Sequence, residues 1–266
     1  MSSLTITFLG TGTSVGIPMV GCDCEVCTSD DPRNKRLRSS IYVETPDCKF
    51  VVDTGPDFRQ QCLRENIREV DAALLTHQHS DHIMGFDDLR RFSIGLDATL
   101  PIYATAQCLE RVQAAFSFAF DKSNWYPGYI KPVGHPVDGP FDLADTRITP
   151  LPVTHGKVET IGYLFERSGR KLAAYIPDAK TISDESMEAL LGVECLIIDA
   201  TKISELPTHM NVEEALAVRQ QLLDSSNGPR ETWLTHIADQ IDHGTVEAGL
   251  PDGVKIAYDG LKLNLG

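Results

Sequence analysis

The chain has 266 residues, of which 42% are apolar and 23% are charged, and its formal net charge is −14. These are the values of an ordinary globular protein, and no apolar run approaches the roughly 18 residues that a membrane helix needs. Affinity for a long phosphate backbone comes from clustered Lys and Arg, so the acidic balance argues against such a partner. We therefore expect a small substrate, with neither a membrane nor a long nucleic acid as partner.

The first residues, MSSLTITFLGTG, have the pattern of a strand. They contain no basic region and no long apolar core ahead of a cleavage site, so a signal peptide is not expected. This predicts a cytoplasmic protein, in which disulfides are rare and cysteines are metal ligands or buried apolar residues. Four of the seven cysteines are isolated, and we expect each of them to be buried: Cys48, Cys62, Cys108 and Cys195.

The stretch GCDCEVC places Cys22, Cys24 and Cys27 within six residues. A disulfide is not expected in a reducing compartment, and a redox pair fits Cys24 and Cys27 only in spacing. A structural zinc site is the remaining option, and it needs a fourth protein ligand from elsewhere in the chain. A basic cluster follows the cysteines and is either a solvated loop or a contact for phosphate: Arg33, Lys35, Arg36 and Arg38.

Short apolar or alternating runs rich in β-branched residues predict strands along the whole chain. They are residues 5–9, 41–44, 50–53, 72–76, 102–104, 163–166, 172–176, 196–199 and 232–235. Helical spacing predicts helices at 57–65, 106–119, 184–191 and 212–223. No repeat and no linker rich in Pro, Gly or Ser divides the sequence. We therefore predict one domain over residues 1–266 with a layered α/β fold.

Several predicted strands end in a residue that can do chemistry, namely Asp53, His77, Asp178, Asp199 and His236. Strand ends lie along the edges of a sheet, where connecting loops carry functional side chains. This pattern predicts a functional site along one edge of the sheets.

The motif THQHSDH places His77, His79, Asp81 and His82 within six residues, directly after an apolar strand. Imidazoles and carboxylates bind divalent metals, and packing does not explain this spacing. We expect His77 and His79 to bind one ion and Asp81 and His82 to bind a second. Further ligands are needed to complete two sites, and the chain supplies them at other strand ends: His155, Asp178 and His236.

The sequence resembles the metallo-β-lactamase superfamily over almost the whole chain. The resemblance lies in the order of its motifs: GTGT, VVDTG, THQHSDH, a lone His before GY, an Asp after an apolar strand and a late LTH. The resemblance implies an αββα sandwich of two mixed β-sheets flanked by helices, with two divalent ions, zinc or manganese, between the sheets. It assigns His77, His79 and His155 to one ion and Asp81, His82 and His236 to the other. Asp178 would bridge the two ions, and Asp53 would orient a ligand.

Within that superfamily the sequence resembles the PhnP-type cyclic phosphodiesterases, through GCxCxxC, HxHxDH, the late LTH and a closing YDG at 258–260. A related protein of pyrroloquinoline quinone synthesis also has clustered cysteines, so these do not decide the substrate. The resemblance implies that His209 is the catalytic His before a helix; the alternative is an exposed residue at the helix start. The family's fourth zinc ligand is a His, but this chain has Asp239 there. We favour Asp239, with His243 or no zinc as alternatives.

We predict hydrolysis of a small, cyclic phosphodiester by a hydroxide held between two ions, with Asp81 and His209 as catalytic residues and His209 donating a proton to the leaving group. The alternatives are a transfer-RNA 3′-end endonuclease, which the acidic charge disfavours, and a diiron oxidoreductase, which typically has Glu at the position of His79. A β-lactamase is disfavoured by Asp178, and a metal-bound scaffold without activity is disfavoured by the full ligand set and by His209. A glyoxalase-type thioester hydrolase stays open. The sequence does not fix the oligomeric state, and a homodimer is one option.

Overall fold

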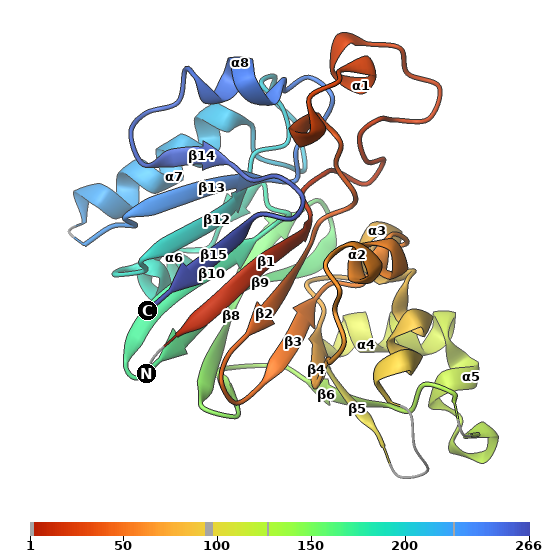
Figure 1. Ribbon diagram of the computed structural model, residues 1–266. Coiled ribbons are helices and arrows are strands. Elements are labelled where there is room, and N and C mark those ends of the chain that lie inside the picture. Colours follow the sequence, from red (N-terminus) through yellow and green to blue (C-terminus); the bar gives the residue numbers. More distant parts are fainter. Residues whose placement is uncertain (1–2, 94–97, 127, 226) are drawn as a thin grey trace.

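Two β-sheets pack face to face, and helices cover the outer face of each sheet (Figure 1). The computed structural model describes residues 3–93, 98–126, 128–225 and 227–266. This arrangement confirms the predicted αββα sandwich. Within the described ranges, no helix is long and apolar enough to cross a membrane.

The first sheet contains both ends of the described chain. Its order is β15 (Lys262–Leu265), β1 (Leu4–Gly10), β2 (Ser40–Glu44), β3 (Lys49–Val52), β4 (Ala72–Leu74), β5 (Leu100–Ala104) and β6 (Pro132–Pro136). Strands β15 to β3 pair antiparallel, whereas β3 to β6 pair parallel. The parallel strands bring their carboxyl ends to one edge of the sheet.

The second sheet is built in the same way. Its order is β11 (Thr181–Ile182), β8 (Thr146–His155), β9 (Val158–Arg167), β10 (Arg170–Ile176), β12 (Cys195–Asp199), β13 (Glu231–Thr235) and β14 (Val254–Ile256), and β7 (Phe141–Leu143) also pairs with β8. Strands β10, β12, β13 and β14 are parallel. Their carboxyl ends therefore also share one edge.

Helices complete the two outer layers. The first sheet is covered by α2 (Phe58–Arg64), α3 (Ser80–Ile83), η2 (Phe86–Phe92), α4 (Ala106–Ala115) and α5 (Ser117–Phe120), and the second by α6 (Asp184–Leu190), α7 (Val212–Asp224) and α8 (His243–Glu247) (Figure 1). A short helix, η3 (Lys122–Asn124), follows α5. The N-terminal loop carries α1 (Glu25–Thr28) and η1 (Pro32–Asn34). Each outer layer has its own apolar cluster.

The central core lies between the sheets. The rings of Phe50 on β3 and Phe165 on β9 are 5.6 Å apart, and the hydroxyl of Tyr163 donates a hydrogen bond of 2.8 Å to the carbonyl of Leu75. Both interactions join one sheet to the other.

Helix α7, on the outer face of the second sheet, begins with a capping box of Asn211 and Glu214, in which the side chain of each residue accepts a hydrogen bond from the backbone N–H of the other.

All nine predicted strands are present, but several strands give no strong signal in the sequence. The longest of these, β8, contains Pro150 and Pro152, which normally argue against a strand. In the structure both prolines lie between the segments of β8 that pair with β7 and β11, so β9 is the only strand of the described ranges that pairs with β8 there.

The predicted single helix 106–119 is wrong, because the chain leaves helical geometry at Phe116 (φ −120°) and forms α4 and α5 instead. Of the four isolated cysteines, Cys48, Cys108 and Cys195 are buried as expected, whereas Cys62 is only partly buried. The prediction of one domain over 1–266 stays a prediction.

Candidate metal centre

Strands from both sheets end at one cavity of about 360 Å³. Its walls come from loops that follow β1, β4, β8, β10, β12 and β13. The cavity is lined by Ser14, His79, Asp81, His155, Gly156, Lys157, Val158, Asp178, Thr208, His209 and His236. The predicted edge site therefore exists as a concave surface rich in groups that bind metals and protons.

Two of the strand-end residues have left-handed backbone conformations. The φ angles are 65° at Asp53, directly after β3, and 58° at His236, directly after β13. Such angles are uncommon for residues other than glycine, and they are concentrated at functional sites, where the surrounding structure holds them. Here they turn each side chain toward the residues of the neighbouring strand ends.

Three histidines converge at one end of the cavity. The Nε2 of His77 lies 2.9 Å from the Nδ1 of His79, and the Nε2 of His155 lies 3.2 Å from that same Nδ1. His77 and His79 come from the loop after β4, whereas His155 ends β8 in the other sheet. The structure therefore brings together the three residues predicted for one ion.

The hydrogen bonds around these histidines determine which nitrogen faces the cluster. The hydroxyl of Thr76 donates to Asp53, so it accepts from the Nδ1–H of His77. The carbonyl of Thr208 accepts from the Nδ1–H of His155. The Nε2 atoms of His77 and His155 consequently carry no proton, and each offers a lone pair.

A second group contains Asp81, His82 and His236, with Asp178 between them. The Nε2 of His82 lies 3.2 Å from Asp81 Oδ2 and 3.1 Å from Asp178 Oδ2, and the Nε2 of His236 lies 3.2 Å from Asp178 Oδ1. Three of these atoms are buried without a hydrogen bond in the described part of the chain: His82 Nε2, Asp178 Oδ2 and His236 Nε2. Buried polar atoms normally have partners, so this set fits a metal ion.

Asp53 supports this second group from behind. Its carboxylate accepts hydrogen bonds from the backbone and hydroxyl of Thr76 and from the Nδ1 of His82, the last at 2.8 Å. The ring of His82 is thereby held with Nε2 toward Asp81 and Asp178. Asp53 therefore lies where the family resemblance implies it, as a carboxylate that orients a candidate metal ligand.

Asp199, at the end of β12 in the second sheet, orients two further histidines, His209 directly and His236 through Thr201. Its carboxylate accepts from the hydroxyl of Thr201 (2.7 Å) and from the Nδ1 of His209 (2.9 Å). Because Thr201 donates to Asp199, it accepts from the Nδ1–H of His236 at 3.0 Å. The ring of His209 is stacked on that of His236, with centroids 4.8 Å apart.

The direction of the pKa shift divides these histidines into two groups, one with a lowered and one with a raised pKa. Burial lowers the pKa of His77 well below its usual value and also lowers the pKa of His79 and His236, which favours neutral imidazoles that can bind metal. Burial also opposes protonation of His82, but the charges of Asp178, Asp53 and Asp81 outweigh it and raise the pKa. For His209, burial is outweighed by the hydrogen bond to Asp199, which raises the pKa.

The donor set therefore fits two divalent cations. One could be held by His77, His79 and His155, a second by Asp81, His82 and His236, and Asp178 is close to both groups. Imidazole and carboxylate ligands suit zinc and manganese alike. The roles of these residues as metal ligands stay predictions. The structure adds that the residues lie close together and that the histidine Nε2 atoms facing the cluster have a lone pair available for a metal.

The three clustered cysteines lie together with Asp239. The Oδ2 of Asp239 is 3.7 Å from the Sγ of Cys22 and 3.7 Å from the Sγ of Cys24, and Cys27 completes the group. Backbone N–H groups point to two of the sulfurs, from Met19 to Cys27 (3.3 Å) and from Cys27 to Cys24 (3.4 Å). The bond from the Cys27 backbone lowers the pKa of the Cys24 thiol, which favours a thiolate there.

His243 does not reach these cysteines. It is buried, and its Nδ1 accepts a hydrogen bond of 3.0 Å from the guanidinium of Arg36. Between the two candidates for a fourth ligand, the geometry favours Asp239. The loop of Asp239 is also joined to the N-terminal loop through Thr11 and Ile237, whose backbone groups bond at 2.8 Å.

The basic cluster of the N-terminal loop is used within the chain. Arg33 pairs with Asp31, Lys35 donates to the carbonyl of Cys27, Arg36 is buried beside His243, and Arg38 pairs with Asp57. The option that this cluster contacts phosphate is therefore not supported for Arg36, which has no access to a ligand. Arg38 instead holds the loop at the cavity, because it donates to the carbonyl of Ser14 at 3.0 Å.

Sequence reasoning missed the positioning roles of Asp199, Thr201 and Thr208, as well as Lys157 at the cavity mouth. Asp199 has a signal, because it ends an apolar strand. The two threonines act through one hydroxyl and one carbonyl, for which the sequence has no pattern. Lys157 follows His155 by two residues and is exposed.

Comparisons with known proteins agree with this geometry. The family model described as the Beta-lactamase superfamily domain matches residues 49–237. An octanoyltransferase of Porphyromonas gingivalis is 36% identical over 259 residues; the match covers 96% of this chain but only 50% of that protein, so the chain spans about half the length of this relative.

Two solved structures show the same fold over nearly the whole chain. A diphosphatase from the PhnP family is 36% identical with a TM-score of 0.89, covering 98% of this chain and 97% of the other. The Zn²⁺-bound PqqB from Methylobacterium extorquens has a TM-score of 0.77 at 20% identity, covering 97% and 99%, and this likeness concerns the fold alone.

The chain belongs to the metallo-β-lactamase superfamily. Within it the chain is PhnP-like, as predicted from GCxCxxC and HxHxDH. The fold and the donor groups together support a metal-dependent hydrolase.

Proposed function

We propose that this protein is a dinuclear metal-dependent phosphodiesterase that hydrolyses a small, cyclic phosphodiester. The observation that carries the proposal is the position of His209, which lines the cavity beside the histidine and carboxylate cluster and is oriented by Asp199. When bound, the ions would supply an activated water and positive charge for the phosphate oxygens. A protonated imidazole beside them adds the group that a leaving alkoxide needs.

The proton is held at a defined atom of His209. Its Nδ1 donates to Asp199, so Nε2 is the nitrogen left to donate to a substrate. The Asp199 carboxylate stabilises the imidazolium form of the ring, in the way that a buried carboxylate supports a catalytic His. Asp81 lies at the cavity wall within the second ligand group and contributes negative charge that favours a cation there.

Cavity size and charge support a small anionic substrate. The volume of about 360 Å³ is at the lower end of small-molecule sites, which run from about 300 to 1,000 Å³. Lys157 is an exposed cation at the mouth, and Ser14 offers a hydroxyl on the opposite loop. The net charge of −14 disfavours a long nucleic acid. The proposal includes a cytoplasmic location, no membrane partner, and a homodimer as an option.

A substrate screen on the metal-loaded protein tests the proposal. It compares cyclic nucleotides, a linear aryl phosphodiester, phosphoric anhydrides such as dinucleoside diphosphates, an octanoyl thioester and a β-lactam. The anhydrides are included because the similar PhnP-family structure is of a diphosphatase, and the thioester because of the octanoyltransferase relative. We expect phosphodiester hydrolysis that is lost on chelation. Hydrolysis of anhydrides or thioesters without phosphodiesters would contradict the substrate class.

A further inference from the structure

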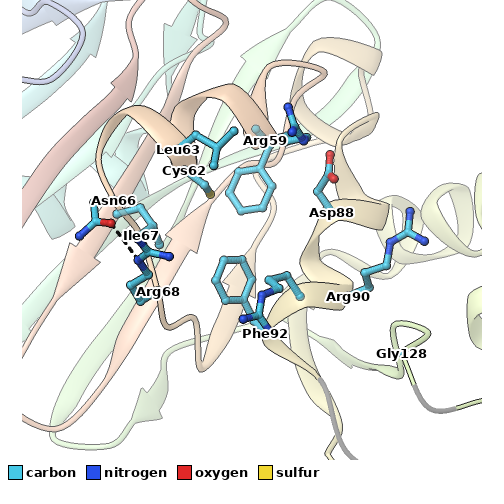
Figure 2. Close-up of a pocket in the computed structure, with 12 residues that line it drawn as sticks. Arg59, Cys62, Leu63, Asn66, Ile67, Arg68, Asp88, Arg90, Phe92 and Gly128 are labelled. Carbon is cyan, nitrogen blue, oxygen red and sulfur yellow. Dashed lines mark hydrogen bonds between the residues drawn. The ribbon is translucent and has the colours of Figure 1, made fainter.

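A second cavity, of about 470 Å³, lies outside the metal centre between α2 and η2 (Figure 2). None of the described residues that line it also lines the metal-centre cavity. Apolar side chains of both elements and of the loop after α2 contribute to its wall: Phe58, Cys62, Leu63, Ile67 and Phe92. Its volume is in the range of small-molecule sites, and its apolar lining is typical of them.

The charged residues of this cavity are predominantly arginines. Among the described residues, four arginines line it, Arg59, Arg68, Arg90 and Arg91, together with one carboxylate, that of Asp88. Figure 2 shows Arg68 on one side of the cavity, Asp88 and Arg90 on the other, and Phe92 between them. This concentration of positive charge stands out on a chain whose net charge is −14. The cavity is therefore suited to an anion.

The four arginines differ in the partners they have. Arg90 pairs with Asp87, and the Nε of Arg68 donates to the Oδ1 of Asn66 at 2.8 Å. Within the described ranges, neither Arg59 nor Arg91 makes a hydrogen bond or an ion pair. Both are exposed, and both guanidinium groups keep their donors for a ligand.

The cavity wall is held by close packing. The rings of Phe58 on α2 and Phe92 on η2 meet edge to face, with centroids 6.4 Å apart. A side chain at Gly85, where η2 begins, would place its Cβ 2.0 Å from the carbonyl oxygen of Gly55 and 2.9 Å from the Cβ of Phe58. Glycine is therefore required for the two elements to approach. A preformed apolar cavity needs little reorganisation to bind a ligand.

We propose that this cavity binds a small amphipathic carboxylate, a molecule with an apolar body and one anionic head. The body would pack against Phe58, Ile67 and Phe92, where removal of apolar surface from water favours binding. The carboxylate would be bound at the rim by the guanidinium of Arg59 or of Arg91, because one guanidinium fork matches its two oxygens. The site is independent of the proposed phosphodiesterase activity.

Calorimetric titration of the metal-loaded full chain with sodium octanoate tests this site. We expect saturable binding of one octanoate per chain, with octanol and octylamine at least tenfold weaker because neither carries the anionic head. Arg59→Gln with Arg91→Gln should weaken octanoate binding roughly tenfold or more. The matched control is Arg147→Gln, an exposed arginine paired with Asp142 on the far hairpin, which should leave the affinity unchanged.

A second variant tests the apolar part. Cys62→Phe fills the cavity, and it should abolish octanoate binding while circular dichroism shows the parent fold. If Cys62→Phe unfolds, the arginine variants still test the proposal, because Arg59 and Arg91 are exposed and their replacement should leave the fold intact. Equal binding of octanol, unchanged affinity in the double arginine variant, or loss of octanoate binding in His209→Ala would each overturn the proposal. A change of oligomeric state in the arginine variants would instead identify this face as an interface between copies, and would also overturn it.

Discussion

The Nδ1 of His209 donates a hydrogen bond of 2.9 Å to the Oδ2 of Asp199, a fully buried carboxylate that ends strand β12. The same carboxylate accepts from Thr201, which in turn accepts from His236. One side chain of the second sheet therefore positions both a candidate metal ligand and the candidate proton donor. This arrangement makes the roles of Asp199 and His209 separable by mutation.

His209→Ala should lower kcat by roughly 10²–10⁴-fold, which is the usual contribution of a positioned acid or base. Because His209 lies outside the two predicted ligand groups, the metal content should stay at two ions in the catalytic centre. Steady-state kinetics and metal analysis of the same preparation check both statements. An unchanged kcat would show that His209 is a bystander near a helix start.

Asp199→Asn should lower kcat by roughly 10²-fold or more, because the amide can donate to His209 Nδ1 and so favour the wrong tautomer. The nearly isosteric change should keep the fold. Asp184→Asn, at an exposed acidic residue at the start of α6, is the matched control and should have parental kinetics. A parental kcat in Asp199→Asn would mean that the carboxylate is structural only.

Asp178→Ala should lose both activity and at least one ion, because this carboxylate is near the nitrogens of His82 and His236 at once. Removal of both ions from the parent protein with a chelator should abolish hydrolysis, and zinc or manganese should restore it. Metal analysis together with activity measures both effects. Full metal content and activity in Asp178→Ala would remove this residue as the link between the two groups.

Asp239→Ala should lose the third ion, a structural zinc, while the two catalytic ions stay bound. The control is His243→Ala, which should retain that zinc but reduce stability by about 1–3 kcal/mol, because the buried Nη2 of Arg36 loses its hydrogen-bond acceptor. Zinc stoichiometry and chemical denaturation distinguish the two variants. A third ion lost only from the His243 variant would reverse the assignment, and no third ion in the parent protein would refute the site.

Lys157→Ala should raise KM for an anionic substrate several-fold with little change in kcat. An exposed cation at the mouth stabilises the bound substrate and the transition state equally, so its loss weakens binding without slowing the chemical step. Lys157→Arg should recover most of the affinity. The effect should shrink at high salt, since exposed charges are screened. A KM unchanged by Lys157→Ala would mean that the side chain does not touch the substrate.

Short-range features of this protein were determined by its sequence alone. The four ligand-type residues of THQHSDH lie within six positions, so no distant contact is needed to bring them together. The nine predicted strands coincide with alternating or apolar runs rich in β-branched residues, which suit the partly or fully buried surface of a sheet. The prediction of one continuous helix over 106–119 was wrong because the break at Phe116 depends on tertiary packing: the rings of Phe116 and Phe120 both pack on Phe86.

Long-range choices were decided only by the tertiary structure. Asp239 and His243 are both close to His236 in sequence, and each has a ligand atom. The chain turns between them, so that Asp239 faces the cysteines, more than 200 residues away, and His243 faces Arg36. The free nitrogens of His77, His155 and His236 likewise depend on threonine contacts that no spacing encodes. Burial removes water as a hydrogen-bond partner, so the folded neighbours alone decide which atom each residue offers.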